Sequence, residues 1–379
     1  MAMIPTSEPK RVSLSHGRVF NFSAGPGMLP TEILEEAKED FLNYKGCGMS
    51  VMELSHRGKI YDEIHMQALQ NLRTLMNIPD DWAVLMLQGG ASLENALVPL
   101  NLKMEGKTPN YIDTGYWGHK SIKDAKKICK IHLAYTSEPS NFDHAPEDNQ
   151  PEFTEDVSYI YFTSNETIGG VDFLRDPDFG VKDALIVCDA SSNILSREFD
   201  LTKYDVIFAG AQKNQGPAGV ATVIVSPRAL EVAKSQDLPL MFSWVDAHKD
   251  HSIHNTPPCF AIYMCGLYYK WLIRNGGVKW ITPINERKAR YVYDAIDNSG
   301  GFYKGHARKE NRSLMNITFQ LPSEELTDKF LSEAKEYGMV TLKGHRSTGG
   351  VRASMYNAFP EEGAKLLGDF MNDFVSKNG

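Results

Sequence analysis

Short apolar runs alternate with segments of helical periodicity along roughly the first 270 residues of the chain. Turn-forming residues bound each run, which predicts strands rather than helices. The expected strands span 83–88, 110–113, 128–134, 158–163, 184–189, 206–209 and 220–226, and the first expected helices span 31–44 and 59–76. Continuous apolar strands that alternate with helices are typical of a mainly parallel sheet covered on both faces. We therefore predict an α/β fold for this part.

The pattern changes after two long helical stretches over 260–274 and 278–297. Beyond the Ser299-Gly300-Gly301 turn we expect strands over 314–320, 339–343 and 351–355, with helices over 323–337 and 361–376. This mixture indicates a small α+β domain. We divide the chain into 1–275, an N-terminal arm with a large domain, and 276–379, a small C-terminal domain.

Composition excludes several classes of protein. The 379 residues carry a formal net charge of −8, which disfavours nucleic acid and anionic membranes as partners. No apolar run approaches the ~18 residues of a membrane span, and the polar start of the chain lacks the apolar core of a secretory signal. The 5 cysteines form no C-x-x-C pair and are read as reduced thiols, so we expect a cytoplasmic protein.

Two predicted strands end in residues that carry chemistry. Asp189 ends the strand over 184–189, and Lys213 follows the strand over 206–209. Ligands of open α/β sheets bind beyond the carboxyl ends of the strands, where a partly desolvated lysine can form an imine with an aldehyde. An acid beside a pyridine nitrogen and a lysine at the aldehyde are what pyridoxal phosphate (PLP) requires. The alternatives are a solvated lysine and an aspartate that caps the following Ser191-Ser192 turn.

A phosphate group needs a cradle, and Gln88-Gly-Gly-Ala-Ser92 lies between a strand and a helix, where backbone N–H groups can hold an anion. A tight turn is the simpler interpretation of the same residues. No G-x-G-x-x-G or P-loop motif is present, which disfavours dinucleotide and P-loop sites. The indole of Trp117, after Asp113-Thr-Gly, offers a flat face for a ring, or a place in the core.

Cationic side chains cluster in glycine-rich turns of an otherwise acidic chain. They are His56-Arg57, His345-Arg346 and Arg352. Arginine grips carboxylates through two parallel hydrogen bonds, and arginine with histidine can share a phosphate, so the set favours a small substrate with two anionic groups. His248, His251 and His254 lack a carboxylate-led motif such as H-E-x-x-H, and we expect no metal site.

Taken together, these motifs resemble the phosphoserine aminotransferase family, in the class V group of fold-type I PLP enzymes. The resemblance covers nearly the whole chain. The matching segments are Asn21-Phe-Ser-Ala-Gly-Pro26, Glu53-Leu-Ser-His-Arg57, Gln88-Gly-Gly, Gly115-Tyr-Trp117, Asn165-Glu-Thr167, Asp189-Ala-Ser-Ser192, Ala211-Gln-Lys-Asn-Gln-Gly-Pro-Ala-Gly219, Asn255-Thr-Pro-Pro258 and Gly344-His-Arg-x-x-Gly-Gly-x-Arg352. The Gln-Lys-Asn, Asn-Thr-Pro-Pro and Gly-His-Arg segments are specific when they occur together.

The resemblance implies PLP as cofactor and assigns roles to the motifs. Lys213 would carry the aldimine and then move the proton between Cα and C4′, Asp189 would pair with the ring nitrogen, and Trp117 would stack on the ring. Thr167 would bond the phenolic oxygen. The residues implied to hold the cofactor phosphate are Ala91, Ser92 and Gln212, joined by Asn255 and Thr256 of the other subunit. A homodimer with shared active sites is therefore implied.

The resemblance also implies the substrates. Arg352 would take the substrate carboxylate, while the phosphate or the glutamate side chain would meet the remaining cationic residues, His56, Arg57, His345 and Arg346. The implied reaction interconverts O-phosphoserine and 2-oxoglutarate with 3-phosphohydroxypyruvate and glutamate, a step of serine biosynthesis.

The chain departs from the family pattern after Ser92, where Glu94-Asn95 replaces a common Gln-Phe pair. A glutamate in the first turn of a phosphate-binding helix adds repulsion unless it points away, which puts the usual packing there in doubt. Two other functions stay open on the same fold: a lyase or desulfurase, the latter needing a mobile reactive cysteine, and a PLP-fold binding protein without turnover.

Overall fold

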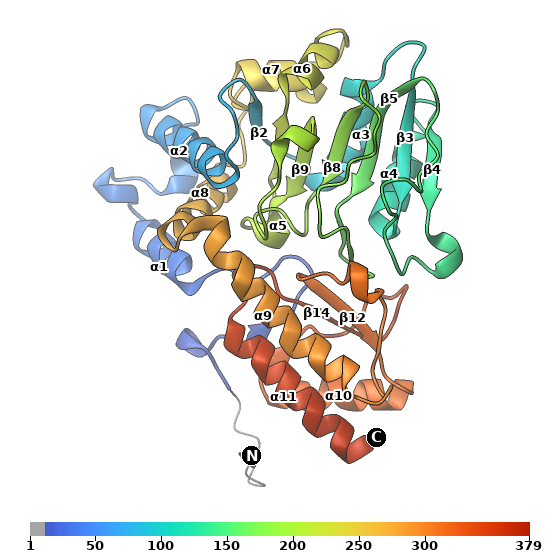
Figure 1. Cartoon of the computed structure of the whole chain (residues 1–379). Helices are drawn as coiled ribbons and strands as arrows, with labels where there is room; N and C mark the ends of the chain where they lie inside the picture. Colours follow the sequence, from blue (N-terminus) through green and yellow to red (C-terminus); the bar gives the residue numbers. More distant parts are fainter. Residues whose placement is uncertain (1–11) are drawn as a thin grey trace.

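The computed structural model describes residues 12–379, so the first part of the predicted N-terminal arm, residues 1–11, lies outside the described residues. A sheet of 7 strands forms the centre of the upper part in Figure 1. In spatial order the strands are β2 (Ala83–Leu87), β10 (Ala221–Val225), β9 (Val206–Gly210), β8 (Leu185–Asp189), β5 (Val157–Thr163), β3 (Thr108–Asp113) and β4 (His132–Thr136). All neighbours pair in parallel except β10, which is antiparallel to β2 and β9. This confirms the predicted α/β fold with a mainly parallel sheet.

Helices cover both faces of this sheet (Figure 1). One face packs on α2 (Lys59–Met76) and α8 (Cys259–Arg274), and the other on α3 (Gly90–Leu102), α4 (Tyr116–Ala125), α6 (Pro227–Lys234) and α7 (Trp244–Lys249). Alternate strand residues divide between the two cores, as Val84 and Leu85 do. Because both faces are buried, the strands are apolar throughout, which is why they were recognisable in the sequence.

Two predicted elements of the large domain have clearly different bounds. The strand expected from 128 begins only at His132, because the amides of Ile128 and Cys129 bond back to the Ala125 carbonyl and extend the end of α4 as turns. The helix expected over 31–44 ends earlier, as α1 (Thr31–Asp40). Its continuation is instead a 3₁₀ turn, Tyr44–Gly46, in which Lys45 has positive φ. A left-handed residue cannot continue an α-helix.

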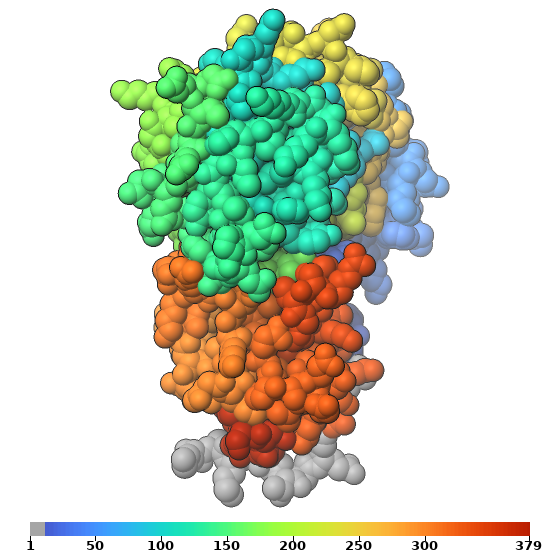
Figure 2. Space-filling model, turned by 90° about the vertical axis from the view of Figure 1, so that its right-hand side faces the viewer, coloured from blue at the N-terminus to red at the C-terminus, as the bar shows by residue number. Residues whose placement is uncertain are grey.

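The C-terminal part lies below the sheet in Figure 1, and its surface adjoins that of the upper part without a gap in Figure 2. Its elements are α9 (Gly277–Asp297), β11 (Lys304–Gly305), β12 (Asn316–Gln320), α10 (Glu324–Glu336), β13 (Met339–Val340), β14 (Val351–Ser354) and α11 (Glu361–Asn378). The strands β11, β12 and β14 form an antiparallel sheet. The strand predicted over 339–343 is shorter and lies outside this sheet, since β13 ends at Val340 and Thr341 has positive φ.

The N-terminal segment joins this lower core. Strand β1 (Phe20–Asn21) pairs in parallel with β13, and Phe20 and Phe22 are buried in the same cluster as Phe330. Helix α9 contributes to both cores, with Val278 in the upper and Val292 in the lower. Because α9 belongs to both cores, the packing does not define one boundary between the two parts. The division at 275/276 stays a prediction. No helix among residues 12–379 is long and apolar enough to cross a membrane.

The short elements that remain bear on the site. They are α5 (Ala211–Asn214), β6 (Asn165–Glu166) and β7 (Val171–Asp172), the last two forming a small antiparallel hairpin. Strand β9 leads directly into α5, and β5 leads through Ser164 into β6. Both connections leave the sheet at the carboxyl edge of its parallel strands, where a ligand is expected.

Candidate active site

A cavity of about 590 Å³ opens at this edge of the sheet. Its lining comes from both parts of the molecule, from the ends of β8 and β9, from the start of α3 and from the segment around β14. The lining residues are Ala24, Gly25, Pro26, Gly89, Gly90, Ala91, Ser92, Asn95, Trp117, Thr167, Ile168, Asp189, Ser191, Gln212, Lys213, Ala218, Gly219, His345 and Arg352. Nine of the residues predicted from the sequence are therefore brought together here: Ala91, Ser92, Trp117, Thr167, Asp189, Gln212, Lys213, His345 and Arg352.

Lys213, on the short helix α5, lines the cavity. Its Nζ donates to Thr167 Oγ1 at 2.6 Å and lies 5.0 Å from the centroid of the Trp117 ring. Burial lowers the pKa of Lys213 to about 8, against the opposing charges of Asp189 and Glu166, and Arg352 lowers it further. A lysine in this state supplies an uncharged amine at mildly alkaline pH, which is the form that attacks an aldehyde.

Asp189 ends β8, beside the strand that leads to Lys213. Its Oδ1 accepts from the Ser191 amide at 2.9 Å and from Ser191 Oγ at 2.5 Å. Burial raises the pKa of the carboxyl, while the Lys213 charge and the Ser191 donors lower it. Within residues 12–379 no donor reaches Oδ2. The turn-capping interpretation is thus correct for one oxygen, and the other is left for a ligand.

The start of α3 forms a cradle for an anion. Gly89 and Gly90 have φ of +90° and +60°, a region that side chains rarely adopt, and they turn the chain from β2 into the helix. The first-turn N–H groups of a helix have no partner within the helix and attract anions. A Cβ on Gly210 would lie 2.8 Å from Gln212 Oε1 and 3.4 Å from the Ala91 nitrogen, so glycine keeps this corner open.

These residues fit PLP. The cavity offers an amine for the aldehyde, a buried carboxylate for the ring nitrogen, an indole for the ring face and helical N–H groups for the phosphate. Two cationic side chains, Arg352 on β14 and His345 in the loop before it, line the same cavity. Arg352 Nη1 approaches the Thr167 carbonyl at 3.4 Å, and His345 packs on Tyr116 with ring centroids 5.5 Å apart. Burial and the charges of Arg352 and Arg346 lower the pKa of His345.

Comparison with known proteins agrees with this geometry. Residues 19–367 match the model of the class-V aminotransferases. The chain belongs to this family. It is 49% identical over 357 residues to the phosphoserine aminotransferase of Halalkalibacterium halodurans, which covers 94% of this chain and 98% of that one. The relative of the same name from Geobacillus kaustophilus is 47% identical with the same coverage. The predicted resemblance is confirmed.

Solved structures of the family superpose closely. The phosphoserine aminotransferase of Bacillus circulans subsp. alkalophilus has a TM-score of 0.91 at 44% identity, covering 96% of this chain and 99% of that one. A PLP-bound phosphoserine aminotransferase from Trichomonas vaginalis has a TM-score of 0.87 at 36% identity, covering 93% and 99%. Class-V aminotransferases are PLP enzymes, so PLP is the cofactor of this chain.

Five predicted residues do not line the cavity of their own chain: His56, Arg57, Asn255, Thr256 and Arg346. His56 and Arg57 lie between a 3₁₀ turn, Val51–Glu53, and α2. The backbone carbonyl of Thr256 accepts from Gln88 Nε2 at 2.9 Å, which holds the 255–256 segment beside the end of β2. Arg346 follows His345 in the exposed turn before β14. Their roles stay predictions.

At the Glu94 departure the structure meets the condition under which we expected no repulsion, a side chain that points away from the cradle. Glu94 is fully buried on α3 and does not line the cavity, whereas Asn95 does and accepts from Ser121 Oγ at 2.7 Å. Burial raises the pKa of Glu94 to about 8. The side chain is therefore mostly neutral at pH 7 and brings no charge to the anion cradle.

Two side chains at the site were missed in the sequence. Lys120 Nζ lies 3.4 Å from Ser92 Oγ and 5.3 Å from the Trp117 ring centroid, adding a cation near the cradle. The spacing of Trp117 and Lys120 could have indicated this contact, since residues three apart lie on the same face of a helix. Glu166 accepts from two backbone amides at the start of α4. Nothing local in the sequence indicates this contact.

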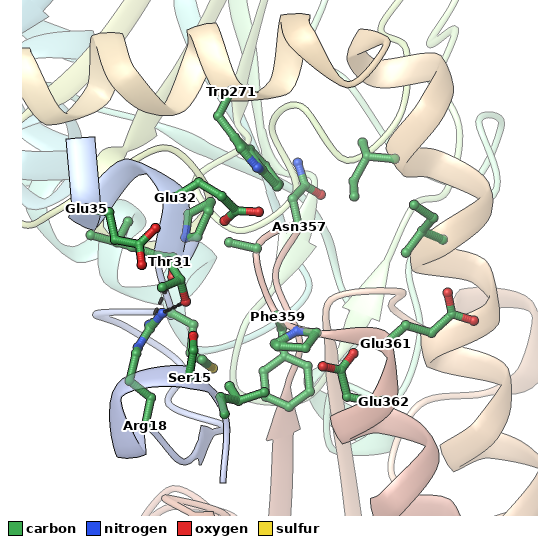
Figure 3. Close-up of a pocket in the computed structure, with 18 of the residues that line it drawn as sticks. Ser15, Arg18, Thr31, Glu32, Glu35, Trp271, Asn357, Phe359, Glu361 and Glu362 are labelled. Atoms are coloured by element: carbon green, nitrogen blue, oxygen red, sulfur yellow. Dashed lines mark hydrogen bonds between the residues drawn. The ribbon is translucent and has the colours of Figure 1, made fainter. Parts of the chain in front are cut away.

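A second cavity of about 600 Å³ lies away from this edge, between α1, the α8–α9 junction and the start of α11 (Figure 3). Its walls include Trp271 and Phe359, and acidic side chains surround it, among them Glu32 and Glu362. It contains no lysine, and the nearby Arg18 is bonded to Thr31 and the Leu29 carbonyl. Without an amine that could bind an aldehyde, it offers none of the chemistry of the first cavity.

Proposed function

We propose that this protein transfers the amino group of O-phosphoserine or glutamate, interconverting O-phosphoserine and 2-oxoglutarate with 3-phosphohydroxypyruvate and glutamate. The observation that carries the proposal is the partly buried Lys213, which contacts Trp117 and Thr167 in a cavity that Asp189 and Arg352 also line. The relatives that match nearly the whole chain bear the name of this activity. Serine biosynthesis is the corresponding metabolic role.

When bound, PLP supplies an aldehyde that accepts the amino group and a ring that withdraws electrons from the substrate Cα. The residues of the chain would transfer the proton and hold the cofactor ring in place. Lys213 would move the proton from the substrate Cα to the cofactor, because its lowered pKa lets it act as a base. Asp189 would pair with the ring nitrogen and keep it protonated, and Trp117 would hold the ring plane. The residues proposed to bind the cofactor are Ala91, Ser92, Trp117, Thr167, Asp189, Gln212, Lys213, Asn255 and Thr256.

Arg352 binds the α-carboxylate that is common to both amino acids, since its guanidinium lies beside Thr167 in the cavity that Lys213 also lines. The second anionic group, a phosphate or a γ-carboxylate, is taken by the other cations. Of these, His345 and Arg346 belong to the same chain's loop before β14. A loop that accepts either group explains how one site serves two substrates of different charge.

We further propose a homodimer in which His56, Arg57, Asn255 and Thr256 complete the partner's cavity, because none of them lines their own. Exposed apolar side chains near these loops support an interface. They are Phe41, Leu42, Met49, Met52, Leu240, Met241 and Phe242, with Leu42 83% exposed. Large apolar side chains gathered at a surface mark an interaction site. Mixing a Lys213→Ala protein with an Arg57→Ala protein should restore activity through hybrid dimers, and two inactive proteins that stay inactive would contradict shared sites.

A desulfurase is disfavoured by the positions of the thiols. None of the described residues that line the cavity is a cysteine, and Cys188 and Cys265 are buried in the core. The free thiols are consistent with the proposed cytoplasmic location.

The proposed function is tested by the two half-reactions. Glutamate should change the visible absorption spectrum of the PLP-loaded protein, and 3-phosphohydroxypyruvate should restore the original spectrum. Hydroxypyruvate, which lacks the phosphate, should restore it at least about 100-fold less efficiently, because two charge-assisted hydrogen bonds are lost. Equal efficiency with both keto acids would overturn the assignment of phosphoserine, and release of ammonia or sulfide would indicate a lyase.

A further inference from the structure

Glu166 is buried at the edge of the site and takes no part in the proposed chemistry. It ends β6, one residue before Thr167, and is 1% exposed. Its two carboxylate oxygens accept from consecutive amides at the start of α4, Oε2 from Trp117 N at 3.0 Å and Oε1 from Gly118 N at 2.8 Å. A carboxylate on the first-turn amides of a 10-residue helix gains from both the hydrogen bonds and the helix dipole.

The surroundings fix this carboxylate closely. A Cβ on Gly115 would lie 2.6 Å from Glu166 Cδ and Cγ, and a Cβ on Gly118 would lie 3.3 Å from Oε1. Glycine at both positions lets the carboxylate sit against the backbone of the turn. Gly115 has an extended φ of 165°, so its need for glycine comes from this contact and not from its backbone conformation.

The residue held by this contact is Trp117, whose ring lies 5.0 Å from Lys213 Nζ. The main-chain nitrogen of Trp117 is itself the donor, so the Glu166 bond fixes the point from which the indole projects. Thr167, the partner of Lys213 at 2.6 Å, is adjacent to Glu166 in the chain. Glu166 thus connects the two groups near the Lys213 amine, Trp117 through its hydrogen bond and Thr167 through the main chain.

We propose that Glu166 is a positioning residue that clamps the first turn of α4 and thereby sets the Trp117 indole against the cofactor ring. The inference rests on the proposed function, because it takes Trp117 as the ring-stacking residue. The clamp also places a negative charge near Lys213, where it favours the protonated amine. Burial and the charges of Asp113 and Asp189 raise the pKa of Glu166 to about 7, opposed by the two amides, so the clamp weakens as the carboxylate gains a proton.

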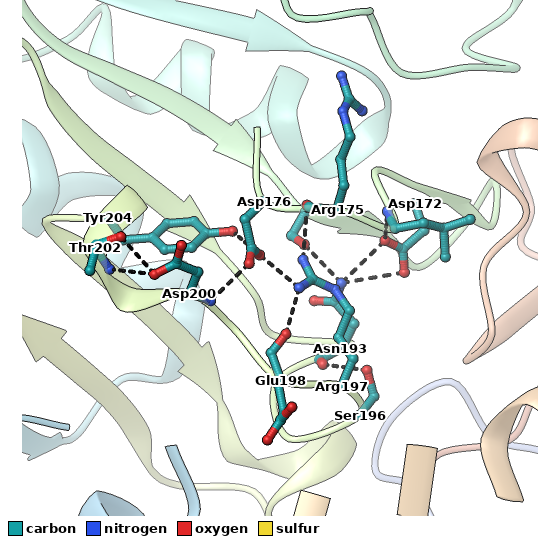
Figure 4. A network of polar contacts seen from close by, with 12 residues as sticks. Asp172, Arg175, Asp176, Asn193, Ser196, Arg197, Glu198, Asp200, Thr202 and Tyr204 are labelled. Carbon is teal, nitrogen blue, oxygen red and sulfur yellow. Dashed lines mark hydrogen bonds and ion pairs between the residues drawn. The ribbon is translucent and has the colours of Figure 1, made fainter. Parts of the chain in front are cut away.

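The matched control is Asp172, a second buried carboxylate on the other strand of the same hairpin. It faces away from α4, accepting from the Leu174 amide at 2.8 Å and lying beside Asn193 in the network around Arg197 (Figure 4). Asp172→Asn therefore removes a buried charge from the β6–β7 hairpin without touching the Trp117 amide. Any general effect of loosening the hairpin appears in this variant as well.

The test is a double-mutant cycle on PLP binding. Glu166→Gln should raise the PLP dissociation constant about 10-fold in the wild-type background and less than about 2-fold when Trp117→Ala is also present, because the clamp acts through the indole. Asp172→Asn should have the same effect in both backgrounds. The visible circular dichroism of bound PLP, which reports ring orientation, should change in Glu166→Gln and not in Asp172→Asn.

A second measurement needs no cofactor. Amide hydrogen exchange of Trp117 and Gly118 in the PLP-free protein should quicken about 10-fold in Glu166→Gln and in Gly115→Ala, whose methyl group displaces the carboxylate from the other side. Unchanged exchange, or equal loss of PLP affinity with and without Trp117, would overturn the inference. Wild-type protein that takes up no PLP would instead contradict the proposed function, and the inference with it.

Discussion

The replacement Glu94→Gln should make the protein more stable, by an amount that grows with pH. Glu94 is 0% exposed, and within the described residues neither carboxyl oxygen has a hydrogen-bond partner. Burial raises its pKa from 4.5 to about 8, reinforced by the charge of Asp189 and opposed by the nearby Trp244 indole. In the unfolded chain the same carboxyl ionises near its ordinary value. Between the two pKa values, the folded protein therefore keeps a proton on the Glu94 carboxyl that the unfolded chain releases.

The sign and size follow from proton linkage. Stability contributed by the protonated carboxyl is complete below pH 4.5 and is lost as the pH rises through about 8. Each pKa unit corresponds to ~1.4 kcal/mol, so the full loss is about 5 kcal/mol, of which about 3 kcal/mol falls between about pH 5.5 and pH 8. Glutamine keeps the shape and stays neutral, and so avoids this loss.

The assay is urea unfolding of the PLP-free protein, followed by tryptophan fluorescence at a series of pH values and one protein concentration. The difference in unfolding free energy between Glu94→Gln and wild type should widen with pH and level off above about pH 8. Glu63→Gln, the same substitution at an exposed glutamate on α2, is the matched control for the change of side chain. A difference that is constant with pH would refute the reasoning, since Glu94 would then titrate alike in both states.

Three further changes test other parts of the account. Arg352→Gln should lower kcat/KM about 10- to 100-fold for both glutamate and phosphoserine, because both lose the partner of the α-carboxylate; a loss confined to one of them in steady-state assays would contradict the assignment. Lys120→Met should weaken PLP binding a few-fold in equilibrium titration, and less at high salt, since it removes only a partly exposed cation near Ser92; an unchanged dissociation constant at low salt would show that it does not act on the phosphate. Lys288→Met should cost about 2–4 kcal/mol of stability, because the buried Nζ bonds the carbonyls of Met355, Tyr356, Asn357 and Phe359, and the melting temperature should fall; an unshifted melting temperature would show that these carbonyls find other donors.

The sequence predicted the elements whose signals are local. Buried strands with continuous apolar residues were recognisable, and with them the placing of Asp189 and Lys213 at one edge of the sheet. The antiparallel direction of β10 could not be predicted, because an apolar run has the same composition in either direction. The pairing of β1 with β13 joins residues more than 300 positions apart, Phe20 with Met339, and no local pattern reports it.

At the site, the sequence found residues whose type reveals their chemistry, such as Lys213 and Arg352. It did not find Glu166, since a carboxylate that accepts from backbone amides is recognised only by where those amides lie. His56 and Arg57 show the opposite case. Their motif drew attention to them, yet the described cavity of a single chain does not include them, which is why a second protomer enters the proposal.

The central claim is that Lys213 holds PLP as the amine of an aminotransferase, and borohydride reduction tests it most directly. The PLP-loaded protein, reduced and digested, should give one pyridoxyl-modified peptide with the label on Lys213, and reduction after addition of glutamate should leave that peptide unlabelled. Label on another lysine, or label on Lys213 that glutamate does not remove, would contradict the account.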